Sequence, residues 1–569
     1  MRGRHRESEL GENAPLTRLA PSVLATLSPQ AGRGEESAAR ELNAMLRPLS
    51  PAVVKAMLTD GEELALIDVR EELVYSQNHL LWARSVPLSR IELRFARLVP
   101  RKSTRIVLID DGDGLVARAA AILTNAGYDD VAYLEGGVAG WEKAGFVTFS
   151  GMHVPSKAFG EFVEHDSGTP SVSAEELDAM MRSGTNMKVL DSRPFDEFNR
   201  VSIPTGIDVP GAELVLRVRD IVPSPDTTIV VNCAGRTRSI IGAQSLIDAG
   251  VPNKVVALRN GTMGWHLAGL KTASGETKRF PEVTGKGLAW ARDAADAVAK
   301  KYGVQRIDRA GLARLQADTA RTTYVFDVRD PDEYKRGHFP GAVSAPGGQL
   351  VQATDTFAGT LGARIVLSDD KEARALMSGA WLRRMGWQEV YVLAEAGDEP
   401  GDLAPALLGT PAMEAAIDVA AVPAAATILD ISRSPEYRRG HIPGAWFAIR
   451  GRLDKALAKI SVTGTLVMTS EDGLLAGLAV AEARKHTSAP VKWLKGGTAA
   501  WVAAGKPLSK EPRMADEALD VWLKPYERAG DPKAGMQEYL TWEVDLIDRI
   551  KQDGTCDFLD SKGRRAAHG

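Results

Sequence analysis

The chain has 569 residues, of which 44% are hydrophobic and 25% are charged, and its formal net charge is −4. This composition is ordinary for a globular protein, and the length corresponds to about four domains of roughly 150 residues. The small net charge argues against nucleic-acid or membrane partners, and no apolar run reaches the roughly 18 residues of a membrane span. Two cysteines exclude a disulfide scaffold and favour a reducing, cytoplasmic location.

The chain divides into a polar beginning, four similar segments and a tail. Residues 1–44 are rich in arginine, glycine, proline and serine, and they contain no apolar stretch like that of a signal peptide. We therefore expect a disordered N-terminal extension there. The four segments that follow share one pattern, which predicts one domain in each. Their expected bounds are 45–150, 165–275, 303–400 and 410–510.

Each of the four segments has an apolar strand that ends in an aspartate, usually with an arginine two residues later. These aspartates are Asp68, Asp191, Asp327 and Asp430. In three segments a histidine stands eleven residues after the aspartate; these are His79, His338 and His441. Chance does not maintain such offsets, so the chain is an internal tandem array of one domain type.

A second apolar strand ends 40 to 42 residues after each aspartate, and a glycine-bearing turn with a tryptophan closes three of the segments. The second strands end at Asp110, Cys233, Asp369 and Ser470, and the closing tryptophans are Trp141, Trp265 and Trp501. The third segment lacks this turn. Strands that alternate with loops and helices predict an α/β fold, in which each domain has a central, mostly parallel sheet flanked by helices.

Two helices are expected outside the four domains. An apolar period between the second and third segments predicts a lone helix over 288–302. The segment 511–569 is predicted to be a helical C-terminal tail. Leu540, Val544 and Ile547 recur at helical spacing, which indicates an amphipathic helix that packs on a domain.

Cys233 is the most informative residue of the chain. An apolar, β-branched run ends at this thiol, and a short basic loop and a predicted helix follow. The first N–H groups of a helix favour anions, so a thiolate is expected to form there at neutral pH. Cys556 instead stands beside Asp557 and near Asp553, and these acids are expected to suppress its thiolate.

These features together resemble the rhodanese (sulfurtransferase) domain family. Its marks are the aspartate-x-arginine strand, a Gly-His-Ile-Pro-Gly-Ala turn, a cysteine loop that opens a helix, and a final Gly-Gly…Gly-Trp turn. The resemblance covers about residues 45–510 and implies four tandem rhodanese-like domains. The catalytic cysteine of the family corresponds to Cys233 alone. The equivalent residues Asp110, Asp369 and Ser470 cannot carry sulfur, so domain 2 is expected to be catalytic and the other three inactive.

The resemblance implies that sulfane sulfur moves from a donor such as thiosulfate to cyanide or a thiol through a persulfide on Cys233. A small anionic donor and a thiophilic acceptor are the expected partners, and a sulfur-carrier protein is a further candidate. No cofactor or metal is expected. Asp191, Arg193 and Trp265 are expected to support the fold. The expected substrate-binding residues are Ala234, Gly235, Arg236, Thr237, Arg238 and Ser239.

Two other functions remain open at this level. Cysteine phosphatases place an arginine six residues after the cysteine, whereas here Ser239 occupies that position and Arg236 and Arg238 stand three and five residues after Cys233. Alternatively, the four domains form a non-catalytic scaffold for sulfur-transfer partners. The acidic loops of the three copies without cysteine motivate this second reading.

Overall fold

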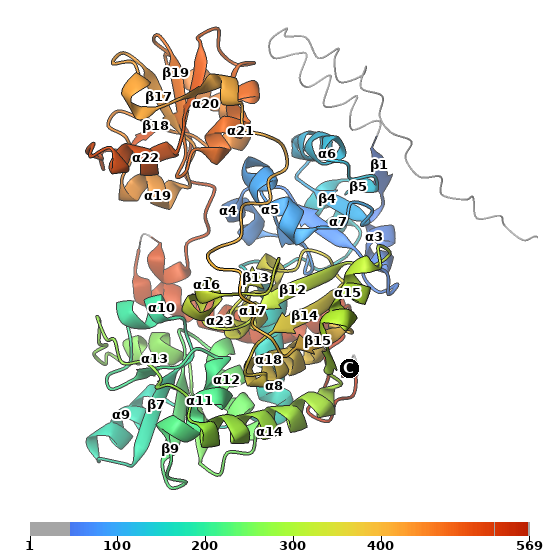
Figure 1. Cartoon of the computed structure of the whole chain (residues 1–569), viewed down its shortest axis with the longest axis vertical. Helices are drawn as coiled ribbons and strands as arrows, with labels where there is room; N and C mark the ends of the chain where they lie inside the picture. Colours follow the sequence, from blue (N-terminus) through green and yellow to red (C-terminus); the bar gives the residue numbers. More distant parts are fainter. Residues whose placement is uncertain (1–45, 529, 567–569) are drawn as a thin grey trace, which may run out of the picture.

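The computed structural model describes residues 46–528 and 530–566, in which four β-sheets follow one another along the chain (Figure 1). The strands named below pair in parallel throughout these sheets, for example β2 (Ala65–Asp68) with β4 (Ile106–Ile109). Helices flank each sheet, since parallel strands need crossover connections. The four-domain α/β prediction is therefore confirmed. The extension predicted for residues 1–44 lies outside the described residues.

The sheets of domains 1, 2 and 3 have five strands in the same relative order. In domain 1 this order is β1-β5-β4-β2-β3, which puts the strand that ends at Asp110 in the centre of the sheet. The elements of domain 1 are β1 (Arg47–Leu49), α3 (Pro51–Met57), β2, α4 (Glu72–Gln77), β3 (Arg84–Ser85), α5 (Ile91–Leu98), β4, α6 (Leu115–Asn125), β5 (Val131–Leu134) and α7 (Gly137–Lys143).

Domain 2 repeats this arrangement, with β9 in the place of β4. Its elements are β6 (Ser171–Val172), α9 (Ala174–Arg182), β7 (Met187–Asp191), α10 (Phe195–Arg200), β8 (Ile207–Asp208), α11 (Glu213–Ile221), β9 (Thr228–Asn232), α12 (Thr237–Asp248), β10 (Val255–Leu258) and α13 (Gly261–Leu267). The continuous apolar sequence of β9 fits a central parallel strand, which is covered on both faces.

Domain 3 has no helix after its last strand, in agreement with the missing closing turn. Its elements are β11 (Gln305–Ile307), α15 (Arg309–Ala317), β12 (Thr323–Asp327), α16 (Pro331–Arg336), β13 (Val343–Ser344), α17 (Gly347–Gln352), β14 (Arg364–Ser368), α18 (Ala373–Arg384) and β15 (Val390–Leu393).

The sheet of domain 4 has a sixth strand, β21, which pairs with β18 and comes from the segment expected to be tail. This sheet therefore extends past residue 510. The elements of domain 4 are β16 (Ala416–Ile417), β17 (Thr427–Asp430), α19 (Ser434–Arg439), β18 (Trp446–Phe447), α20 (Leu453–Lys459), β19 (Leu466–Thr469), α21 (Leu474–Ala483), β20 (Val491–Leu494), α22 (Gly497–Ala503) and β21 (Arg513–Met514).

Three helices connect the domains. The predicted lone helix is confirmed as α14 (Gly285–Tyr302), and the predicted tail helix as α23 (Pro532–Asp553). The prediction that Leu540 and Val544 both pack on a domain is wrong in part, because Leu540 is buried but Val544 is 44% exposed. A third helix, α8 (Val154–Ser167), fills the segment between domains 1 and 2, where only a linker was expected. The largest apolar cluster joins these three helices to domains 2 and 3.

The repeated histidines have a structural role. His79, His338 and His441 are buried, and each stacks on a tyrosine four residues earlier, with ring centroids 3.9 to 4.0 Å apart. In domain 2, Phe198 and Ser202 occupy these two positions. The domain that contains the thiol therefore lacks the stacked pair, and its core is closed by Phe198, which is fully buried.

Candidate functional site

Cys233 follows the last residue of the central strand β9, and α12 begins four residues later, at Thr237. The carboxyl ends of parallel strands are the usual ligand-binding edge of an open α/β sheet. Only 2% of Cys233 is exposed, and the residue lines a cavity at this edge. The thiol therefore meets the N-terminus of α12 inside a sheltered space.

The loop after Cys233 presents unpaired backbone donors. Within residues 46–528 and 530–566, the N–H groups from Ala234 to Arg238 donate no hydrogen bond, and no side chain caps α12. Ser239 differs, because its N–H and its hydroxyl both donate to the carbonyl of Arg236, at 3.1 and 2.8 Å. Unpaired N–H groups at a helix N-terminus attract an anion, so the loop forms an open cradle beside the thiol.

In domains 1 and 4 the side chain at the cysteine position fills this cradle. Asp110 accepts hydrogen bonds from the N–H groups of Gly112 at 2.9 Å and Val116 at 3.0 Å. Ser470 accepts one from the N–H of Ala476 at 3.3 Å. A built-in carboxylate or hydroxyl thus satisfies donors that would otherwise face a bound anion.

Domain 3 fills its cradle most completely. The carboxylate of Asp369 accepts from the N–H groups of Lys371, Arg374 and Ala375, at 3.0 to 3.3 Å. The side chain of Arg374 also pairs with Asp369, at 2.8 Å, and both side chains are fully buried. Arg374 also forms an ion pair with Glu213 of domain 2, at 2.8 Å, so this loop connects domains 2 and 3.

A chain of hydrogen bonds connects the cysteine to the aspartate-x-arginine pair. Arg193 forms a two-pronged ion pair with Asp191, at 2.7 and 2.8 Å. Asp191 also accepts from the side-chain amide of Asn232, which donates to the hydroxyl of Thr262 as well. Thr262 in turn donates to the carbonyl of Cys233, at 3.0 Å. Asp191 and Arg193 are therefore linked to the cysteine loop through Asn232 and Thr262, and the supporting role expected for them stays a prediction.

The closing turn of domain 2 lies directly against the cysteine loop. Gly261 has φ of +54°, and a Cβ atom there would lie 2.3 Å from the carbonyl oxygen of Cys233, so only glycine fits. Trp265 is buried, and its indole N–H donates to the carbonyl of Lys271 at 2.9 Å. This bond closes the turn.

Both loop arginines already pair with carboxylates. Arg236 binds Glu161 of α8 through two hydrogen bonds of 2.7 Å and also contacts Glu164. Arg238 binds Glu197 of α10 through two hydrogen bonds of 2.8 and 2.9 Å. Burial opposes the charge on Glu197, but Arg238 lowers the pKa of this carboxyl to about 2. The arginines therefore stay charged but largely neutralised beside the thiol.

The tail contributes side chains that the sequence did not reveal. Glu543 of α23 is fully buried, pairs with Lys157 of α8 at 2.8 Å, and accepts from the hydroxyl of Thr237 at 3.3 Å. Despite burial, Glu543 and then Tyr539 raise the pKa of Lys157 above its usual range, so this ammonium stays charged at neutral pH. A Cβ atom on Gly235 would lie 3.1 Å from Glu543, which shows how closely α23 covers the loop.

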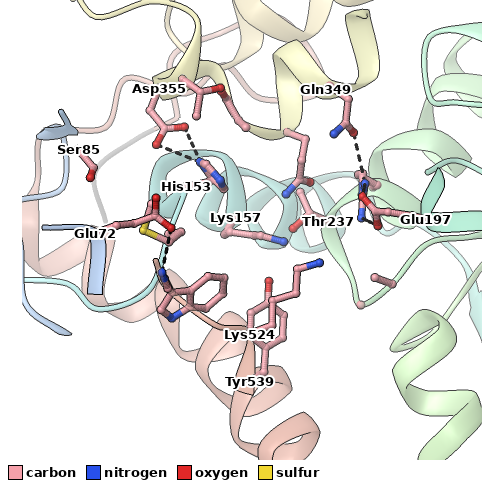
Figure 2. A pocket seen from close by; sticks show the side chains of 18 of the residues that line it. Glu72, Ser85, His153, Lys157, Glu197, Thr237, Gln349, Asp355, Lys524 and Tyr539 are labelled. Atoms are coloured by element: carbon pink, nitrogen blue, oxygen red, sulfur yellow. Dashed lines mark hydrogen bonds and ion pairs between the residues drawn. The ribbon is translucent and has the colours of Figure 1, made fainter. Parts of the chain in front are cut away.

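All four domains and the tail line the cavity around the loop, which has a volume of about 560 Å³. Figure 2 shows Ser85 and Glu72 of domain 1 on one side, Thr237 and Glu197 of domain 2 on the other, and Lys157 between them. Domains 1, 3 and 4, which have no cysteine at this position, therefore supply walls for the site of domain 2.

Cys556 is buried in the apolar cluster shared by domains 2 and 3. Burial, followed by the carboxylate of Asp553, raises the pKa of this thiol, as the neighbouring acids suggested. We therefore expect iodoacetamide near neutral pH to modify Cys233 and to spare Cys556. Peptide mass spectrometry measures the extent of labelling of each thiol. The control is the urea-unfolded chain, in which both thiols react. Equal labelling of the two thiols in the folded protein would contradict this assignment.

Neither a metal site nor a membrane-spanning helix is found in the part of the chain that the structure describes. No group of three or more His, Cys, Asp and Glu side chains in residues 46–528 and 530–566 is placed to hold a metal ion. No helix within those residues has the length and apolarity needed to cross a membrane.

Fold and site together define a multidomain α/β protein with one candidate nucleophile. The family model of the rhodanese-like domain matches residues 50–144, 173–268, 310–396 and 414–504, and the chain belongs to this family. A thiosulfate sulfurtransferase from Pseudomonas aeruginosa has a similar solved structure, with a TM-score of 0.88 and 46% identity, covering 90% of this chain and 100% of that one. An uncharacterized protein from Synechocystis is 32% identical over 98 residues. That match spans 17% of this chain and about half (54%) of the relative.

Proposed function

We propose that this protein is a sulfurtransferase, in which domain 2 moves sulfane sulfur from a thiosulfate-type donor to a thiophilic acceptor through a persulfide on Cys233. The observation that carries the proposal is a difference between the loop after Cys233 and the equivalent loops of the other three domains. The cysteine loop leaves its N–H groups from Ala234 to Arg238 unpaired within the described residues, whereas Asp110, Asp369 and Ser470 fill theirs. Membership of the rhodanese-like family and the similarity to a thiosulfate sulfurtransferase support it.

In the first half-reaction, the thiolate of Cys233 attacks the outer sulfur of thiosulfate. A new S–S bond forms to Sγ, the S–S bond of thiosulfate breaks, and its electron pair leaves with sulfite. The donor, the departing sulfite and the persulfide are all anions. The unpaired N–H groups and the charged Lys157 lower the energy of these anions in the cavity.

In the second half-reaction, the carbon of cyanide or the sulfur of a thiolate attacks the outer sulfur of the persulfide. The bond to Sγ breaks and its electron pair restores the thiolate of Cys233, so neither an oxidant nor a reductant is consumed. Asp191 keeps the loop still during this exchange, because it holds Asn232 and, through Thr262, the carbonyl of Cys233.

The spacing of the loop argues against a phosphatase. A phosphatase of the cysteine class places an arginine six residues after the cysteine to bind the phosphate group, but Ser239 occupies that position here. A scaffold without activity is disfavoured as well. Scaffolding does not require an open cradle, or a cavity to which all four domains contribute.

The proposal is tested by initial rates of thiocyanate formation from thiosulfate and cyanide. We expect parallel double-reciprocal lines, because the two substrates react in separate steps. We also expect no hydrolysis of p-nitrophenyl phosphate by the same preparation. Phosphate release without thiocyanate formation would favour the phosphatase, and the absence of both activities would favour the scaffold.

We predict that Arg238 binds the sulfonate end of the donor rather than activating the thiol. Arg238→Ala should lower kcat/KM for thiosulfate by roughly ten- to a hundredfold, through KM, because one charge-assisted hydrogen bond is lost. The pH profile for alkylation of Cys233 should hardly move, since Glu197 already neutralises much of the charge of Arg238.

The matched control removes the ion pair as a unit. Arg238→Ala alone leaves the carboxylate of Glu197 unpaired beside the loop. The double variant with Glu197→Gln removes that charge. If the double variant recovers the wild-type KM, the loss came from the stranded carboxylate, and Arg238 does not bind the donor.

A further inference from the structure

Three arginines of the silent domains face the same cavity as the cysteine loop. Arg90 and Arg94 come from domain 1, and Arg433 comes from domain 4. Arg94 donates to the carbonyl of Ser85, and Arg433 pairs with Glu72. Figure 2 shows Ser85 and Glu72 across the cavity from Thr237. Neither domain contains a reactive thiol, so these cations need an explanation other than activation of a local nucleophile.

Arg433 is available because domain 4 departs from the repeat. In the other three domains the arginine stands two residues after the aspartate and pairs with it, as in Asp68 and Arg70. In domain 4, Ser432 occupies that position, and its N–H donates to Asp430 at 2.9 Å. Burial without an arginine partner raises the pKa of Asp430 to about 6. Arg433, displaced by one residue, reaches into the cavity and contacts Glu72 at 3.1 Å.

Arg94 is the least satisfied cation of this wall. It lies on α5 and donates one hydrogen bond, of 3.1 Å, to the carbonyl of Ser85. No carboxylate in residues 46–528 and 530–566 lies within ion-pair distance of its guanidinium. Burial lowers the pKa of Arg94 below its usual value, because the charge lacks full compensation. An anionic ligand in the cavity would compensate the charge of Arg94.

Cations outnumber acids among the residues that line the cavity, with seven Lys and Arg residues against five Asp and Glu residues. The cations near the thiol are paired with acids behind the wall, Arg236 with Glu161 and Lys157 with Glu543, so the excess positive charge lies on the arginine wall. The acids that line the cavity near the arginine wall are Glu71, Glu72, Asp355 and Asp520, and Glu471 contacts Arg90 at 3.6 Å. Asp355 pairs with His153 at 2.8 Å, and burial raises the pKa of Glu71 to about 7, which reduces its negative charge near neutral pH. Arg94 therefore remains the strongest uncompensated charge of this wall.

The cavity is also larger than the donor requires. Thiosulfate has five non-hydrogen atoms, whereas about 560 Å³ is within the range of sites that enclose much larger ligands. A second substrate with its own anionic group fits the remaining space between the thiol and the arginines.

We propose that Arg94, with Arg90 and Arg433, binds the carboxylate of a small thiol that accepts sulfur from Cys233. This inference rests on the proposed sulfurtransferase function and names the class of acceptor: a low-molecular-weight thiol that carries a carboxylate. The silent domains 1 and 4 thereby contribute a specificity site to the reaction of domain 2. The thiolate of the acceptor attacks the persulfide as described above, and its carboxylate takes no part in bond changes.

The test compares two acceptors with the full chain. Arg94→Gln should raise KM for glutathione roughly ten- to a hundredfold. The same variant should leave KM for thiosulfate and the rate with 2-mercaptoethanol, a thiol without a carboxylate, unchanged. Arg97→Gln is the matched control, because Arg97 lies on the same helix but donates to the carbonyls of Leu403 and Ala404 outside the cavity. This control should behave as wild type with both thiols.

A second variant covers the chance that Arg94→Gln does not fold. Arg433 has a side chain that is 36% exposed, so Arg433→Gln is expected to fold, and it should also raise KM for glutathione. Equal effects of the Arg94 and Arg433 variants on glutathione and 2-mercaptoethanol would overturn the acceptor site while leaving sulfur transfer intact. If thiosulfate fails to load Cys233 at all, the proposed function itself is wrong.

Discussion

Replacement of Cys233 by serine is expected to abolish sulfur transfer. The loss should be at least roughly a thousandfold in kcat, because a serine hydroxyl cannot form a persulfide and the other three domains offer no thiol at this position. The fold should survive, since the exchange replaces one small buried side chain by another. Thiocyanate formation and thermal unfolding of the variant measure the two effects.

Cys556→Ser is the matched control for this experiment, because it removes the second thiol of the chain. This control should retain the rate of both half-reactions. Turnover by Cys233→Ser above the uncatalysed background would disprove the assignment of a single active domain. A slow second half-reaction in Cys556→Ser would instead make Cys556 a relay for the sulfur.

The second large effect is expected from the buried ion pair that fixes the tail over the loop. Glu543→Gln leaves the ammonium of Lys157 without its partner, in a site where the lysine side chain is only 12% exposed. Removing one partner of a buried pair costs about 3–5 kcal/mol, so the variant should unfold at clearly lower temperature or urea concentration.

Asp545→Asn is the control for this change, because Asp545 is an exposed acid on the same helix that forms no ion pair among the described residues. This control should unfold like the wild type. If Glu543→Gln and Asp545→Asn unfold at the same midpoint, α23 is not held by this pair, and its cover over the cysteine loop is not a stable part of the site.

The repeated part of the fold could be predicted because its determinants are local. Aspartate ends one strand in all four segments, the next strand ends 40 to 42 residues later, and glycine recurs at the closing turn of three segments. The steric reason is visible at Gly261 and at Gly497, where a Cβ atom would lie 2.3 and 2.0 Å from the carbonyl oxygens of Cys233 and Ser470. Such positions accept only glycine, so they can be recognised from the sequence.

The walls of the cavity could not be predicted, because they come from contacts between distant parts of the chain. Glu543 lies 306 residues from Thr237, to which it is hydrogen-bonded. Nothing in the local sequence of either residue marks this contact. For the same reason α8 was missed, and the stripe on α23 that included Val544 was assigned from helical periodicity alone. In the structure Leu546 is buried instead, since the helix meets several surfaces.

The most direct test of the central claim is the intact mass of the protein after incubation with thiosulfate and removal of the excess donor. We predict a gain of one sulfur atom, located on Cys233 by peptide mapping and lost again on addition of cyanide. An unchanged mass, or a sulfur atom located on Cys556, would contradict the assignment of domain 2 as the site of sulfur transfer.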